Sequence, residues 1–458
     1  MQKARKILLY GSILLIGGLV TFSSAPYLRQ FLFNTGMLQE KIMIAGTGSM
    51  YPTFPKGEGS TDILRAQETV AWPKMRHFPG GFNILGYKLF SYNLQRGDIV
   101  DLENQKTREL SKQKYGEEAG FVKRIIALPG DKLNFRDGYV SINDNILEEP
   151  YTAKPRSTFG GDFLPDCRIL AIPNDKVFVM GDNRKASLDS RFDLGLIDIS
   201  DIKFVLPVDE QGEYQKLYRD TSKDSSLANT ATLDASEFVR LVNEKRKEKN
   251  LKPFKLDKLL SLSAKRRGSV MISSDDFSIE ATRSGVTLEK SLKEVGYRNI
   301  VFAEIYSRGY FEADELLDNF LEFPQTKNIL FAGDYQDIGL SPVLGEINNC
   351  PVEVVVVQFG GYVPPNYKKE HIDSWQKLVD NLTEVLPTWE ALRDAKNIDQ
   401  TKLSQLLDIL RQRKDIGSKV LSRMKANQWL TDAEETMVAQ DKKLSEEAEK
   451  IVGDLNKN

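Results

Sequence analysis

The N-terminal segment constrains this chain most strongly, because it favours one helix that crosses a membrane. Lys3, Arg5 and Lys6 precede a predominantly apolar run over residues 7–22. Basic residues stay on the cytoplasmic side of such a helix, so we expect a cytoplasmic N-terminus with the bulk of the chain outside. The run is shorter than the roughly 20 residues of a full span. Apolar residues resume over 27–33, so a tilted or extended helix can supply the missing length.

A cleavable signal peptide is the competing interpretation of the same segment. Small residues at Ser23, Ser24 and Ala25 are typical of a cleavage site. Pro26 follows directly, and a proline there removes the backbone N–H and fixes φ, which opposes processing. We therefore favour an uncleaved anchor, which predicts a single-pass protein of the plasma membrane in contact with the lipid bilayer.

The length and charge of the chain limit its architecture and partners. Its 458 residues exceed what one hydrophobic core usually supports, so two or three domains are expected. The formal net charge is −2, whereas a protein that binds nucleic acid needs a basic face to neutralise phosphates. Nucleic acid is therefore not expected as a partner.

Cysteine and histidine are scarce, which excludes several kinds of site. The two cysteines, Cys167 and Cys350, have no metal-ligand spacing, and we favour two free thiols over one long-range disulfide. The two histidines, His77 and His371, lie in no recognisable motif. A Ser-His-Asp triad, a histidine metal site and a cofactor are therefore not expected.

Ser49 lies in a loop, residues 44–53, that is rich in glycine and proline. Gly46 and Gly48 allow the backbone to approach a ligand closely, and Pro52 restricts the chain just beyond the serine. A serine in such a loop is either a nucleophile or a turn residue, and this segment alone leaves both interpretations open.

Lys123 interrupts an apolar run that ends in the turn Pro129-Gly130-Asp131. A lysine in such a strand is normally exposed at a sheet edge. If it is buried instead, loss of water lowers the pKa of its amine. The neutral amine can then accept a proton from a serine hydroxyl without help from histidine.

Two further segments carry polar residues at the ends of predicted strands. Residues 96–98, Arg-Gly-Asp, form a turn that enters a strand. An apolar strand over residues 177–180 leads into the polar loop 181–191, which is rich in Asp, Asn, Ser and Arg. That loop is either a surface loop with local ion pairs or part of a functional site.

In this order, the four segments resemble type I signal peptidases over roughly residues 5–208. The family motif S-M-x-P-T corresponds to Ser49 as the nucleophile, and K-R-x-x-x-x-P-G-D to Lys123 as the general base. The motif G-D-N-R-x-x-S-x-D-S-R corresponds to residues 181–191. Ala127 and Ala186 replace a common glycine and a common asparagine, and neither takes part in proton transfer.

The resemblance implies a mostly antiparallel β catalytic domain and a set of residues that support the dyad. Thr47 corresponds to a hydroxyl that helps to stabilise the oxyanion, and Ser187 to the serine that hydrogen-bonds the lysine. Asp189 and Arg191 correspond to a supporting ion pair. No metal is implied.

The resemblance also implies the substrate, a preprotein whose signal peptide has small apolar residues at the first and third positions before the cleavage site. Ile42, Ile44 and Met50 are candidates for the pocket wall, with plain core packing as the alternative. Two other functions compete: a catalytically inactive membrane-anchored binding protein, and a Ser/Lys protease dedicated to another substrate.

Residues 236–362 resemble the CAP superfamily in its bacterial SCP-like form, through an amphipathic opening helix, the fragment around Glu304 and the strand over residues 352–359. The resemblance implies an αβα sandwich. Ile279 and Thr326 stand where the family places its two cation-binding histidines, which leaves Glu304 as the only expected ligand, so a metal site is not expected. The interpretation is a non-catalytic binding or spacer module whose partner is unknown.

The C-terminal region is charged and prone to form helices. Leu406, Ile409 and Leu410 follow helical spacing, which predicts a short bundle or a helical arm, with a partner-binding helix as the alternative. The predicted organisation is an anchor over 1–33, a catalytic domain over 34–208, a linker over 209–235, a CAP-like domain over 236–365 and a helical region over 366–458.

Overall fold

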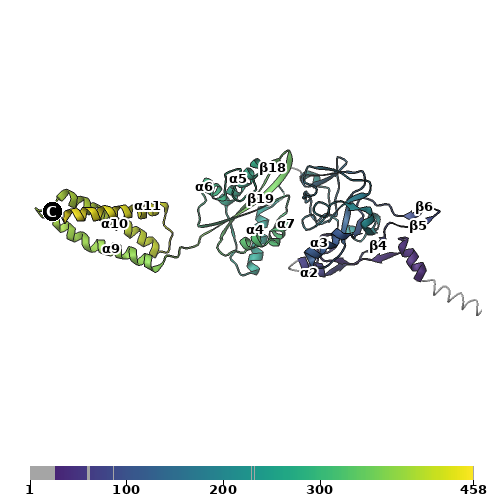
Figure 1. The fold of residues 1–458 in the computed structure, drawn as a ribbon, viewed down its shortest axis with the longest axis horizontal. Coiled ribbons are helices and arrows are strands. Elements are labelled where there is room, and N and C mark those ends of the chain that lie inside the picture. The colour runs from purple at the N-terminus through teal and green to yellow at the C-terminus, as the bar shows by residue number, and fades with distance from the viewer. Residues whose placement is uncertain (1–25, 59–61, 86, 228–229, 232, 457–458) are drawn as a thin grey trace, which may run out of the picture. The chain divides into compact units, whose positions relative to one another are not determined.

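The computed structural model describes residues 26–58, 62–85, 87–227, 230–231 and 233–456. The chain divides into two compact units, Met1–Gly361 and Tyr362–Asn458. Within the first unit, an N-terminal β region precedes an α/β region (Figure 1).

The β region is built on a seven-stranded sheet in the order β1-β4-β15-β7-β8-β13-β14, in which every pairing is antiparallel. The mostly antiparallel β fold that the sequence resemblance implies is therefore confirmed. In sheet order the strands are β1 (Gln39–Lys41), β4 (Lys74–His77), β15 (Ile202–Leu206), β7 (Ile99–Leu102), β8 (Phe121–Ala127), β13 (Lys176–Met180) and β14 (Ile197–Asp198).

Smaller elements surround this sheet. A four-stranded sheet and two strand pairs complete the β structure, and two helices lie in the connections. The sheet has the order β11 (Asn145–Ile146), β10 (Tyr139–Ile142), β9 (Lys132–Arg136) and β12 (Ile169–Ala171). The pairs are β2 (Ile44–Ala45) with β3 (Thr69–Ala71) and β5 (Gly80–Ile84) with β6 (Tyr87–Ser91), and the helices are α2 (Asp62–Gln67) and α3 (Gln105–Tyr115).

The core of the β region follows from strand alternation. Along β8, Phe121 and Ile125 face one apolar cluster, while Ile126 faces another on the opposite side. Lys123 lies between Phe121 and Ile125 on the same side of the strand, so the fold places its amine in an apolar layer. β8 is thus buried along its length, and its lysine is an interior residue.

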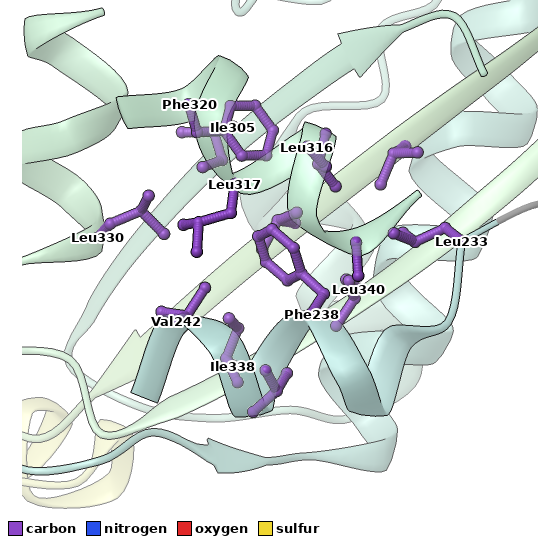
Figure 2. Packing of buried hydrophobic residues seen from close by; sticks show 14 of the residues in the cluster. Leu233, Phe238, Val242, Ile305, Leu316, Leu317, Phe320, Leu330, Ile338 and Leu340 are labelled. Carbon is purple, nitrogen blue, oxygen red and sulfur yellow. The ribbon is translucent and has the colours of Figure 1, made fainter. Parts of the chain in front are cut away.

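The α/β region has helices on both faces of the four-stranded sheet β16-β18-β19-β17, as the predicted αβα sandwich requires. Alternate residues of β19 separate the layers, because Val355 and Val357 pack against α4 and α7 while Val354 and Val356 pack on the α5 side. Figure 2 shows Phe238 of α4 and Leu316 of α7 in the first of these two layers. The strands are β16 (Lys255–Leu256), β17 (Val301–Arg308), β18 (Asp337–Ile347) and β19 (Cys350–Gly361). The helices are α4 (Ala235–Glu248), α5 (Lys258–Ser274), α6 (Leu288–Val295), α7 (Ala313–Glu322) and α8 (Pro324–Leu330).

The prediction of two free thiols is wrong, because Cys167 of the β region and Cys350 of the α/β region form a disulfide. Asn348 and Asn349 both have positive φ, 53° and 61°, as the tight turn between β18 and β19 requires. This turn places Cys350 at the end of the hairpin, with its Cα 5.8 Å from that of Cys167. Sequence spacing could not reveal the pair, since 183 residues separate the two cysteines.

Replacing both cysteines with serine is expected to lower the free energy of unfolding of this unit by about 2–4 kcal/mol. The disulfide restricts the unfolded chain across a separation of 183 residues. Urea denaturation of the full chain, with and without reductant, measures the effect. Reductant should move the wild type to the midpoint of the double variant and leave the variant unchanged. Equal midpoints for the oxidised wild type and the variant would contradict this expectation.

The second unit is helical, as predicted. α9 (Lys369–Glu390), α10 (Gln400–Lys425) and α11 (Asp432–Leu455) form a bundle in which α10 contacts both of the others. Leu406 is fully buried in its core, together with Leu403 and Val420. Proline and glycine commonly end helices, but Pro387 lies inside α9 and Gly417 lies inside α10.

The apolar run predicted as an anchor, residues 7–22, lies outside the described residues. Helical turns cover residues 26–34, where the structure begins. Within the described part of the chain, no helix combines the length and the apolar character needed to cross a membrane.

Candidate active site

Ser49 lies in a turn just after β2, anchored by its neighbours on both sides. Gly48 has a φ of +76°, a conformation that side chains rarely adopt, and its carbonyl accepts a hydrogen bond from the Tyr51 N–H at 3.1 Å. Met50 is buried in an apolar cluster with Ile44. These contacts fix the backbone and leave the Ser49 side chain only half-buried.

Lys123 meets this serine from β8. Its Nζ donates hydrogen bonds to Ser49 Oγ and to the Val122 carbonyl, both at 3.0 Å. The residue is only 4% exposed, and Phe121 places its ring 5.2 Å from the ammonium nitrogen. The structure therefore brings together the two residues that the sequence motifs single out, although 74 positions separate them.

Burial sets the protonation of this lysine. Loss of water lowers the pKa of Lys123 from its ordinary 10.5 to about 8. The carboxylates of Asp189 and Asp182 oppose this shift, while Lys114 and Arg191 add to it. A substantial fraction of the amine is neutral near pH 8, as a general base requires.

Thr47 places a hydroxyl beside the nucleophile. Its Oγ1 donates to Ser49 Oγ at 3.3 Å and accepts from the Ser49 N–H at 3.5 Å. A backbone donor and a hydroxyl thus lie next to the position where an oxyanion would form. The oxyanion role itself stays a prediction.

The loop over residues 181–191 packs directly against the serine loop. The Asn183 N–H donates to the Ser49 carbonyl at 3.1 Å. Gly181 allows this approach, because a Cβ there would collide with that carbonyl and with the Ser187 hydroxyl. The two loops therefore support each other.

Asp189 and Arg191 form the ion pair that the resemblance implied. Both side chains are buried, with Asp189 Oδ1 2.9 Å from Arg191 Nε and Oδ2 3.0 Å from Nη2. The Gly181 N–H also donates to Asp189, at 3.1 Å. Arg191 and these hydrogen bonds outweigh burial and keep the pKa of Asp189 below its usual value.

Ser187 does not make the hydrogen bond expected of it. Among the described residues no hydrogen bond joins its buried hydroxyl to Lys123. The hydroxyl contributes instead to the lowered pKa of Asp189. Its role in orienting the amine therefore stays a prediction.

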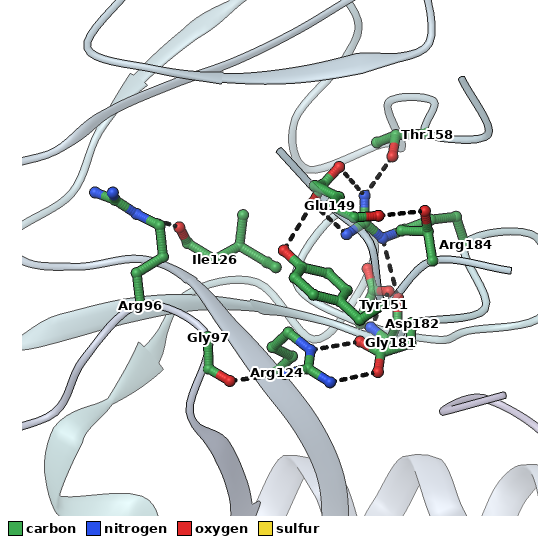
Figure 3. A network of polar contacts seen from close by, with 12 residues as sticks. Arg96, Gly97, Arg124, Ile126, Glu149, Tyr151, Thr158, Gly181, Asp182 and Arg184 are labelled. Carbon is green, nitrogen blue, oxygen red and sulfur yellow. Dashed lines mark hydrogen bonds and ion pairs between the residues drawn. The ribbon is translucent and has the colours of Figure 1, made fainter. Parts of the chain in front are cut away.

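A buried polar network supports the site from behind, and sequence reasoning missed it (Figure 3). Arg124, next to Lys123, forms a bidentate pair with Asp182 at 2.8 and 2.7 Å. Arg184 pairs with Glu149 at 2.5 Å and donates to the Gly181 carbonyl at 3.1 Å. The one feature of the sequence that indicates this network is the high density of charged residues directly after apolar strands.

The α/β region covers the outer side of the same loop. The amine of Lys185 is buried, with its Nζ 4.0 Å from the ring centroid of Phe311 and 4.8 Å from that of Phe159. Burial lowers the pKa of Lys185 to about 8, against the attraction of the nearby Glu315 carboxylate on α7. The α/β region thus contacts Lys185, which lies two positions before Ser187 in the polar loop.

A cavity of about 270 Å³ opens beside Ser49 and Lys123. Ile42, Ile44 and Met50 all line it, as expected for pocket-wall residues. They also belong to, or pack against, one apolar cluster, so the core-packing interpretation holds at the same time. The cavity offers the dyad a mostly apolar surface for a peptide side chain.

The α/β region does not form a cation site around Glu304. Glu304 pairs with the buried Arg267 at 3.1 Å and accepts a hydrogen bond from Gln358 at 2.8 Å. Ile279 is exposed, and the Thr326 hydroxyl donates to backbone carbonyls. No group of three or more His, Cys, Asp or Glu suited to a metal occurs among the described residues.

Comparison with known proteins links the β region to one family. The family described as "Signal peptidase, peptidase S26" matches residues 22–205. Signal peptidase I T of Bacillus subtilis (strain 168) is 34% identical over 203 residues, which cover 43% of this chain and 81% of that protein. Signal peptidase I P of Bacillus subtilis subsp. natto is 36% identical over 121 residues, 25% of this chain and 58% of that protein.

One solved structure aligns with more than half of the chain at low sequence identity. An extracellular protein containing a SCP domain, from Bacillus anthracis str. Ames, aligns with 57% of this chain and 97% of that one, with 14% identity and a TM-score of 0.25.

Proposed function

Because the chain belongs to the signal peptidase I family of serine endopeptidases, we propose that it removes signal peptides from exported preproteins with Ser49 as nucleophile and Lys123 as general base. The observation that carries this proposal is the 3.0 Å hydrogen bond between Lys123 Nζ and Ser49 Oγ, made by a lysine that is 4% exposed.

The mechanism follows from the positions of these groups. Ser49 Oγ attacks the scissile carbonyl carbon while neutral Lys123 accepts its proton. The Ser49 N–H and the Thr47 hydroxyl stabilise the oxyanion, an effect of roughly 3–4 kcal/mol per donor. The intermediate collapses to an ester on Ser49, and the protonated lysine gives its proton to the leaving amine. Water then hydrolyses the ester, with Lys123 again as the base.

The rate is expected to rise with pH through the pKa of Lys123. The reactive form is the neutral amine, and its pKa is about 8. About a tenth of the amine is neutral at pH 7 and about nine tenths at pH 9. A plot of kcat/KM against pH should therefore rise about tenfold per unit below that pKa and level off above it. A rate that is constant over the same range would contradict a lysine base.

An exposed apolar surface on the β5–β6 hairpin supports the proposed contact with a lipid bilayer. Leu85 is 95% exposed at the tip of the β5–β6 hairpin, and Phe90 and Tyr87 are 71% and 74% exposed beside it. The ring of Phe31, from the helical turns over residues 26–34, lies 5.8 Å from that of Phe82 in this hairpin. We place the chain in the plasma membrane through a single N-terminal anchor, with its catalytic domain outside.

For the α/β region we propose a CAP-like binding or spacer module without catalysis of its own. The ion pair between Glu304 and Arg267 supports this, because it uses the one remaining ligand of the family's cation site. The domain boundaries proposed from the sequence, 34–208, 236–365 and 366–458, complete this account.

Cleavage of a defined preprotein tests the proposed function. The purified full chain is incubated with a preprotein that carries an Ala-x-Ala site, and mass spectrometry identifies the new N-terminus. We expect one cut directly after the second alanine. A folded chain that leaves this preprotein intact, or that cuts only itself, would favour the inactive protein or the dedicated protease.

A further inference from the structure

Asp101 is a carboxylate in the wall of the active-site cavity that the Ser49–Lys123 chemistry does not use. It lies on β7, opposite Val122 of β8 and Phe204 of β15. Directly paired residues share one face of a sheet, and on this face Val122 and Phe204 pack against an apolar cluster. An acidic side chain therefore occupies an otherwise apolar wall.

No partner in the described chain satisfies this carboxylate. Among the described residues, no hydrogen bond or ion pair reaches the Asp101 side chain. Loss of water and the nearby Glu103 carboxylate, opposed by Lys203, together raise the pKa of Asp101 to about 6. Lys123, which is largely neutral at alkaline pH, is the one basic residue among the described residues that line the cavity.

Other aspartates of the β region contrast with Asp101, because each has donors from the fold. Their donors are Tyr92 and two backbone N–H groups for Asp98, Arg96 and Asn143 for Asp131, Arg124 and Thr53 for Asp182, and Arg191 for Asp189. The part-buried Asp101 carboxylate lacks such donors and lines the cavity, so a basic group of a ligand can pair with it there.

The wall beside Asp101 is held firmly in place. α3 begins at a capping box formed by Asn104 and Thr107 and ends at Gly116, whose φ is 83°. Ser111 and Tyr115 of this helix line the same cavity. The carboxylate therefore faces a preformed space in which a long side chain can be recognised by its charged end.

We propose that Asp101 widens substrate specificity by receiving a basic side chain, lysine or arginine, at the third position before the cleavage site, where the family resemblance implies a small apolar residue. This inference rests on the proposed function, which places the residues before the scissile bond in this cavity. In an extended peptide the first and third side chains point to the same side. The first must lie beside Ser49, whose Oγ attacks its carbonyl, so the third is the next side chain to enter the cavity.

The experiment compares two preproteins that differ only at that third position, which is lysine in one and methionine in the other. The ratio of their kcat/KM values is measured for the wild type, Asp101→Asn and Glu103→Gln. We expect Asp101→Asn to lower the lysine-to-methionine ratio at least about tenfold, because a charge-assisted hydrogen bond is lost. Glu103→Gln removes a neighbouring charge outside the cavity and should change the ratio less than about twofold.

A pH series on the wild type provides a second measurement that needs no variant. The two substrates share the Ser49–Lys123 chemistry, so its pH dependence cancels in the ratio. Glu103, Lys203, Glu117 and Lys123 are the charged groups around Asp101. We expect the ratio to fall as the pH drops from about 8 to about 5 and the Asp101 carboxylate gains a proton.

Two results overturn the inference: a ratio that Asp101→Asn leaves unchanged, and a wild-type ratio that does not vary with pH. If the wild type cleaves neither preprotein, nor one with Ala-x-Ala, the proposed function has failed instead.

Discussion

Replacing Lys123 with alanine is expected to lower kcat/KM for preprotein cleavage by at least about a thousandfold. The Ser49 hydroxyl then has no base within hydrogen-bond distance, because Lys123 Nζ at 3.0 Å and the Thr47 hydroxyl at 3.3 Å are its polar neighbours among the described residues. Thr47 cannot replace an amine as a proton acceptor. The fold should persist, since alanine removes a buried amine that costs free energy to desolvate.

Two further variants separate proton transfer from simple electrostatics. Lys123→Arg keeps a cation at the site, but a guanidinium stays protonated and cannot act as a base, so it should be as inactive as the alanine variant. Lys132→Ala removes an exposed lysine on β9 and should retain full activity. If Lys123→Arg retained most of the activity, the positive charge rather than proton transfer would be the contribution of this residue.

Replacing Asp182 with asparagine is expected to lower the free energy of unfolding of the β region by about 3–5 kcal/mol. The side chains of Asp182 and Arg124 are 0% and 1% exposed, and their carboxylate and guanidinium groups are 2.7 Å apart. Asparagine keeps the shape but leaves the Arg124 charge buried without its counter-charge. The side chains of Thr53 and Gln211 also accept hydrogen bonds from Arg124, but they carry no charge to compensate.

Hydrogen–deuterium exchange of the β8 and β13 peptides measures this loss locally, so unfolding of the helical unit does not obscure it. Asp198→Asn is a matched control, because it breaks an ion pair with Lys176 whose aspartate side chain is 47% exposed. That variant should change stability by less than about 1 kcal/mol. Equal exchange rates in the two variants would contradict a structural role for the Arg124–Asp182 pair.

The sequence predicts which serine and which lysine meet, because local motifs identify both residues. Ser49 is identified by its own loop and Lys123 by its own strand, and the family resemblance supplies their relation. The antiparallel β domain and the αβα sandwich follow from the two family resemblances, and the C-terminal helices follow from local hydrophobic periodicity. Each of these predictions concerns residues that are close together in the chain.

The features that the sequence does not predict depend on long-range packing. The Cys167–Cys350 disulfide forms where the β18–β19 hairpin reaches the β region, a juxtaposition that spacing cannot encode. The Arg124–Asp182 pair joins β8 to the loop that follows β13, across 58 residues of sequence. In the sequence, Asp101 resembles an ordinary exposed residue of a strand with alternating polarity. In the structure, it lines the cavity together with residues of β8 and α3.

The central claim is that Ser49 and Lys123 act as one unit, and a double-variant comparison tests it most directly. Cleavage of the Ala-x-Ala preprotein is measured for Ser49→Ala, Lys123→Ala and the combined variant. The account predicts that all three retain the same low residual rate, because removing either member already removes the covalent route. Substantial cleavage by Ser49→Ala, or separate losses that multiply in the combined variant, would contradict it.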